Sequence, residues 1–62
     1  MKKRILATAP TIERITKYVN DYFYSNKYTV NPSTLKIEHP TKELTGYSIK
    51  KTGDRYQFIE NL

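Results

Sequence analysis

Hydrophobic side chains recur every three or four positions across residues 10–24. The recurring residues are Ile12, Ile15, Val19, Tyr22 and Phe23. This spacing is typical of an amphipathic helix that buries one stripe, and Thr16 is small enough to share that stripe. The opposite side carries Glu13, Arg14, Lys17, Asn20 and Asp21. The pattern therefore predicts a helix over residues 10–24.

Polar residues at both ends of this segment indicate how the helix begins and ends. Thr8 or Thr11 can cap the first turn, and Pro10 suits that turn because its missing amide would have no partner there. Glu13 lies near the positive end of the helix dipole. We expect Asn26 to end the helix in the left-handed conformation.

The middle of the chain shows weaker β patterns. Residues 28–30 favour a strand, and residues 31–33 form an Asn-Pro-Ser turn signal. Residues 35–39 alternate between apolar and charged side chains, which indicates a half-buried strand. Residues 41–45 fit one helical turn before Gly46.

The C-terminal segment predicts a β-hairpin. Residues 47–52 and 55–60 flank Gly53-Asp54, a pair suited to a two-residue turn. Pairing across this turn aligns Thr52 with Arg55, Lys51 with Tyr56 and Ile49 with Phe58. One face then holds Tyr47, Ile49, Tyr56 and Phe58, and the other holds Ser48, Lys50 and Gln57. Register and turn therefore agree.

These elements predict an α+β domain in which one amphipathic helix packs on a small antiparallel sheet. The sheet has three strands in the order α-β-β-β, or four in the order β-α-β-β-β if residues 4–7 add a strand. The expected core is Ile12, Ile15, Val19, Phe23, Val30, Leu35, Ile37, Ile49, Tyr56 and Phe58. A minimal winged helix is the alternative, with short helices over residues 33–38 and 40–44. The two-residue spacing of Leu35 and Ile37 argues against it.

Chain length and composition narrow the functional classes. A chain of 62 residues forms one domain over residues 1–62, because it cannot fill two cores. It has no cysteine, so disulfides and cysteine zinc sites are excluded. Pairing with a second copy would enlarge so small a core, which makes a homodimer one expectation.

The first nine residues imitate a secretory signal. A basic start precedes Ala7-Thr8-Ala9, which resembles a cleavage site. A signal needs an apolar stretch of about 7–15 residues between those parts, and the aliphatic run here is only Ile5–Leu6–Ala7. The same run is too short to span a bilayer. We therefore expect a cytoplasmic protein without membrane contact.

Catalytic constellations are sparse in this sequence. His39 is the only histidine, and its place in the strand pattern favours a partly buried strand-end residue over a base or metal ligand. The six acidic residues are scattered singly, and two glycines do not make a phosphate-binding loop. We expect a protein that is not an enzyme and needs neither metal nor cofactor.

The charge balance favours an acidic partner. Eleven Lys and Arg against six Asp and Glu give a net charge of +5, and six Tyr accompany them. Rings interleaved with cations bind nucleic acids, which predicts a DNA- or RNA-binding module. Its expected contacts are Lys2, Lys3 and Arg4 near the N-terminus, a hairpin cluster with Lys50, Lys51 and Arg55, and the stacking rings Tyr56 and Tyr28. Residues 1–4 form either a flexible arm or the start of an edge strand, and the sequence leaves both open.

A second hypothesis explains the same residues without nucleic acid. Most rings are needed as core, and exposed lysines on a hairpin also discourage strand-to-strand aggregation. Tyr18 and Tyr24 remain outside the apolar stripe and suit the anchors of a protein partner. The alternative prediction is therefore a protein-interaction module that uses a sheet edge or these two tyrosines.

Overall fold

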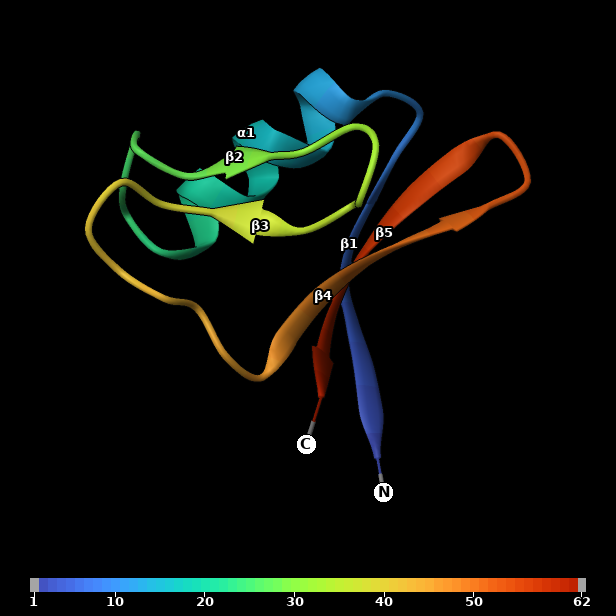
Figure 1. Cartoon of the computed structure of the whole chain (residues 1–62). Coiled ribbons are helices and arrows are strands. Elements are labelled where there is room, and N and C mark those ends of the chain that lie inside the picture. The colour runs from blue at the N-terminus through green and yellow to red at the C-terminus, as the bar shows by residue number, and fades with distance from the viewer. Residues whose placement is uncertain (1, 62) are drawn as a thin grey trace.

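The computed structural model describes residues 2–61 and contains one helix and five strands. The elements are β1 (Lys3–Ala9), α1 (Ile12–Tyr22), β2 (Thr29–Val30), β3 (Ile37–Glu38), β4 (Tyr47–Thr52) and β5 (Arg55–Asn61). An antiparallel sheet has the order β1-β5-β4, and β2 pairs with β3 in a separate ribbon near α1 (Figure 1). The predicted α+β class, with one helix on an antiparallel sheet and a C-terminal hairpin, is confirmed.

The N-terminal residues form an edge strand of the sheet. β1 pairs with β5 from Lys3 opposite Asn61 to Ala9 opposite Tyr56. Of the two alternatives for these residues, the edge strand is confirmed and the flexible arm is wrong for Lys3 and Arg4. Lys2 precedes the strand, and Met1 lies outside the described residues. The register shifts at Leu6, and this β-bulge lets Leu6 and Ala7 both pack against the core.

The helix begins at Ile12, two residues later than predicted. The Thr11 side chain caps it, since its Oγ1 accepts a hydrogen bond from the Arg14 amide at 3.2 Å. Thr8 cannot cap it because Thr8 lies within β1. Pro10 precedes the cap, and Glu13 lies in the first turn as expected.

Tyr24, rather than Asn26, takes the left-handed conformation that ends the helix. Its φ is 53°, and its amide donates to the Asp21 carbonyl at 3.3 Å. The Ser25 amide donates to the Asn20 carbonyl at 2.9 Å, which completes a Schellman motif. Glycine is the usual residue here, because a side chain in this conformation costs roughly 1–2 kcal/mol. Tyr24 is nevertheless 96% exposed.

Asn20 holds the segment that follows α1 against the helix through side-chain hydrogen bonds. Its Nδ2 donates to the Tyr28 carbonyl at 3.0 Å, and its Oδ1 accepts from the Tyr28 amide at 2.9 Å. Its Nδ2 also lies 3.1 Å from the Thr16 carbonyl. The prediction that Asn20 faces solvent is wrong, because the side chain is half-buried and replaces a strand partner for Tyr28.

The segment between β2 and β4 contains less regular structure than predicted. The expected strand over residues 35–39 is reduced to Ile37–Glu38, because Leu35 turns the chain with a φ of 57°. Asn31 organises this turn: its carbonyl accepts from the Leu35 amide at 2.8 Å, and its side chain accepts from two further amides. Residues 33–38 and 40–45 contain no helix, so the winged-helix alternative and the predicted helical turn are both wrong.

The hairpin has the predicted register. Thr52 pairs with Arg55, Lys51 with Tyr56 and Ile49 with Phe58. Gly53 adopts a φ of 62°, which a two-residue turn with glycine at its first position requires. This short turn sets the alternation of side chains on β4 and β5, and so decides which of them face the helix.

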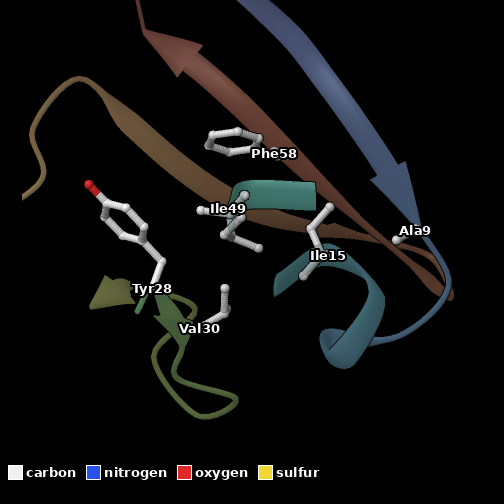
Figure 2. Close-up of a cluster of buried hydrophobic side chains, with 7 residues drawn as sticks. Ala9, Ile15, Tyr28, Val30, Ile49 and Phe58 are labelled. Atoms are coloured by element: carbon white, nitrogen blue, oxygen red, sulfur yellow. The ribbon is translucent and has the colours of Figure 1, made fainter. Parts of the chain in front are cut away.

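One hydrophobic cluster lies between α1, the sheet and the β2-β3 ribbon (Figure 2). All ten predicted core residues belong to this cluster or pack against it. Ala9 and Tyr28 are additional buried members, and the side chain of Tyr28 is only 7% exposed. Its expected place at the molecular surface is therefore wrong.

No helix within residues 2–61 is long and apolar enough to cross a membrane.

Replacing Asn20 with Ala should lower the free energy of unfolding by about 2 kcal/mol, because the backbone of Tyr28 then loses two partners in a half-buried site. Urea denaturation would measure the change. Asn26→Ala is the matched control, since Asn26 is exposed and makes no side-chain hydrogen bond among the described residues. Equal losses in both variants would contradict the stabilising role of the hydrogen bonds between Asn20 and Tyr28.

Replacing Tyr24 with Gly should raise the free energy of unfolding by about 1 kcal/mol, because glycine adopts a positive φ without strain. Tyr24→Ala removes the same ring but keeps the strained backbone, so it should give no gain. Thermal and urea denaturation of both variants would check this. A Tyr24→Gly protein less stable than Tyr24→Ala would refute the strain at this position.

Candidate functional site

The two predicted basic clusters lie at opposite ends of the sheet. Lys3 pairs with Asn61 near the chain termini, whereas Arg55 adjoins the hairpin turn (Figure 1). Six residue steps along β5 separate Arg55 from Asn61, which corresponds to roughly 20 Å of strand. The structure therefore does not gather these clusters at one point.

Strand alternation divides each cluster between the two faces of the sheet. Phe58 and Ile49 face the helix, so their strand neighbours point alternately away from it and towards it. Lys51 lies on the helix side, opposite Tyr56. Arg4 lies on the helix side too, opposite Glu60.

The face of the sheet that points away from α1 is here called the open face. It carries Lys3, Ile5, Thr8, Ser48, Lys50, Thr52, Arg55, Gln57, Ile59 and Asn61. Within residues 2–61 the open face holds no carboxylate, so its three cations are not neutralised there. Ile59 lies at its centre and is buried outside the core cluster, beside Ile5, which is 55% exposed.

Two long polar contacts link side chains across the open face. Asn61 Nδ2 donates to Ser48 Oγ at 3.4 Å, and Thr52 Oγ1 donates to Gln57 Oε1 at 3.5 Å. Both contacts link β4 to β5 diagonally across neighbouring pairs. The cations of the open face therefore lie next to polar side chains that contact one another between β4 and β5.

Arg4 pairs with a largely buried carboxylate, although its own side chain is 61% exposed. Its Nη2 lies 2.8 Å from Glu60 Oε1, and the Tyr47 hydroxyl donates to Glu60 Oε2 at 3.4 Å. Glu60 is largely buried, so its charge needs such partners. The neighbouring Tyr22 hydroxyl, then burial and the charge of Glu60, raise the pKa of the Tyr47 hydroxyl.

The two predicted stacking rings are poorly placed for bases. Tyr28 is buried in the core, so its ring is not accessible. Tyr56 is half-buried, and the Lys51 ammonium lies 5.8 Å from its ring centroid. That distance fits a cation–π contact, which occupies both Lys51 and Tyr56 within the protein.

Exposed tyrosines instead lie along the helix. Tyr18 and Tyr22 border a shallow hollow of about 530 Å³, together with Leu6 of β1. Tyr24 borders a second hollow, and Asp21 lines both. The alternative site residues, Tyr18 and Tyr24, thus lie on neighbouring parts of one surface.

His39 organises the loop that follows β3. Its Nδ1 accepts hydrogen bonds from the Thr41 and Lys42 amides, both at 3.1 Å, and its ring packs 4.7 Å from the ring of Tyr28. The Thr41 hydroxyl lies 3.4 Å from the same nitrogen, which is already occupied by the two amides. Among residues 2–61, no three His, Cys, Asp or Glu side chains are grouped to hold a metal ion.

Several surface residues carried no usable sequence signal. Ile5 and Thr8 join the open face only because β1 pairs with β5, and the bulge at Leu6 hides their alternation in the sequence. Lys27 and Lys42 approach His39 from separate loops, which no local pattern indicates. Contacts between segments far apart in the sequence therefore bring together both the residues of the open face and the residues around His39.

Lowering the pH should destabilise the protein through His39. Partial burial, then the charges of Lys42 and Lys27, lower the pKa of His39 from its usual 6.5. The unfolded chain therefore binds the proton more readily, and the stability contributed by neutral His39 is lost as the pH falls below about 6.5. His39→Asn keeps an acceptor for the two amides but does not titrate. Urea denaturation at pH 7 and pH 5 should show a smaller loss in this variant, and equal losses would contradict the assignment.

No protein-family model, curated protein or solved structure matches the chain.

Proposed function

We propose that the protein binds the phosphate backbone of DNA or RNA through the open face. The observation that carries this proposal is the placement of Lys3, Lys50 and Arg55 on one helix-free face with no carboxylate among the described residues. Cations without neighbouring acids create a positive potential that attracts a polyanion. The net charge of +5 adds to it.

The composition of the open face determines the kind of recognition. It presents aliphatic and small polar side chains between its cations and no aromatic ring, so it offers no platform for stacked bases. Phosphate contacts position a nucleic acid without reading its sequence. We therefore propose sequence-independent binding with a dissociation constant of about 10⁻⁴–10⁻⁶ M at physiological salt.

The other basic residues predicted to contact nucleic acid contribute less to this proposal. Arg4 neutralises Glu60, and Lys51 lies against Tyr56, so neither is needed for a phosphate. Lys2 is exposed immediately before β1 and adds one cation near Lys3. The proposal thus assigns binding to Lys3, Lys50 and Arg55, with Lys2 in support.

Replacing Lys3, Lys50 and Arg55 with Ser should abolish most binding to a fluorescent oligonucleotide. Loss of three phosphate contacts should reduce the slope of log affinity against log salt by about 2 for a single strand. Fluorescence anisotropy over a salt series would measure both quantities.

The matched control replaces Arg14, Lys17 and Lys36 with Ser. These three residues are exposed and lie away from the open face, and their removal changes the net charge by the same amount. The control should bind more tightly than the open-face variant. Equal weakening would show that binding follows net charge alone and would overturn the open face as the site.

A protein partner is the second candidate function, favoured by the exposed tyrosines of α1. Tyr18 and Tyr24 border neighbouring hollows that share Asp21, and tyrosine is a frequent interface anchor. This candidate predicts no salt-dependent binding of oligonucleotides and loss of a specific partner in a Tyr18→Ser, Tyr24→Ser protein. Light scattering of the unmodified protein would test the homodimer that the small size of the core led us to expect.

A further inference from the structure

A hollow of about 390 Å³ lies between the end of α1 and the loop that follows β3. Residues 23–28 line it on the helix side, and His39, Thr41 and Lys42 line it from the loop. The polar side chains that matter most are Tyr24, Asn26, Lys27, His39, Thr41 and Lys42. Its volume is within the range of small-ligand sites. It lies on the helix side of the sheet, away from the open face.

The charge of this hollow suits an anion. Lys27 and Lys42 both line it, and no carboxylate does. The C-terminal end of a helix carries about half a negative charge, which two ammonium groups outweigh. Two carbonyls of the last turn also have partners, because the Asn20 carbonyl accepts from the Ser25 amide and the Asp21 carbonyl accepts from the Tyr24 amide.

His39 adds a directed hydrogen-bond donor. Its Nδ1 accepts from two backbone amides, so the neutral ring carries its proton on Nε2. The hydrogen bonds thus select one tautomer, and Nε2 is available to donate to an anionic oxygen. The ring position is set by its contact with Tyr28.

Tyr24 supplies an aromatic face at the rim of the hollow. It is 96% exposed and has a φ of 53°, where glycine would avoid the strain. An exposed ring kept in a strained conformation contributes little to folding, which points to a role outside the fold. The Schellman motif also restricts the backbone, so the ring is presented from a defined position.

We propose that this hollow binds a nucleotide, with the base stacked on Tyr24 and the phosphate held by Lys27, Lys42 and His39. The combination of an aromatic face with adjacent cations matches a phosphate joined to a planar ring. The phosphorylated end of a nucleic acid strand and a free nucleotide share this chemistry. The inference goes beyond the proposed function and does not depend on the open face.

Titration of ¹⁵N-labelled protein with adenosine monophosphate tests the site. Amide shifts are expected within residues 23–28 and 39–42. Adenosine and inorganic phosphate should each bind roughly tenfold more weakly, because each lacks one half of the contacts. Shifts confined to the open face, or no shifts at millimolar nucleotide, would overturn the proposal.

Variants separate the site from the fold. Tyr24→Gly should fold stably yet bind the nucleotide roughly tenfold more weakly, which is the usual scale of a lost stacking contact. The double variant Lys27→Ser, Lys42→Ser should weaken binding at least as much. Tyr18→Ser and the double variant Lys17→Ser, Lys36→Ser are the matched controls and should bind normally. Normal binding by Tyr24→Gly would overturn the stacking role.

Two further binding experiments identify the source of the phosphate and distinguish this site from the open face. An oligonucleotide with a 5′-phosphate that binds more tightly than its unphosphorylated form, with the gain lost in Tyr24→Gly, identifies a strand end. Equal binding of the two oligonucleotides identifies a free nucleotide. The open-face variant should bind adenosine monophosphate normally, and loss of nucleotide binding in that variant would overturn the separate site.

Discussion

Burial of Phe58 in the middle of β5 joins the parts of this small domain. Phe58 is fully buried and pairs with Ala7 of β1 on one side and Ile49 of β4 on the other. Its ring also meets Tyr22 and Phe23 of the helix segment in edge-on contacts, with centroids 5.5 and 6.0 Å apart. A chain this short has few large buried side chains, so sheet and helix both depend on this contact.

The same packing determines what remains for function. Because β-strands alternate, placing Phe58 inward also turns Lys51 and Arg4 towards the helix side, where Tyr56 and Glu60 engage them. Lys3, Lys50 and Arg55 consequently share the opposite face. Formation of the core therefore places some basic residues on the helix side, where they contact other side chains of the protein, and leaves the others exposed on the open face, where they are available to an anion.

The helix end shows a second relation between folding and surface chemistry. The Asn20 side chain hydrogen-bonds to the backbone of Tyr28, so the chain between these two residues must reverse direction. Tyr24 makes that reversal in a conformation that favours glycine, and its ring projects into solvent beside Lys27 and the loop of His39. The reversal thus places an aromatic ring, two cations and an imidazole around one hollow.

Local periodicity was sufficient to predict the stripe of Ile15 and Val19 and the register of Ile49 with Phe58, because helix pitch, strand alternation and a two-residue turn are short-range constraints. All ten residues that this periodicity assigned to the core belong to the core cluster or pack against it. Only the tertiary structure decided that β1 joins the sheet, that Tyr28 is buried and that Asn20 faces inward, because each depends on partners far along the chain. The candidate sites follow the same division: the sequence indicated which cations to consider, whereas long-range pairing decided which of them share a surface.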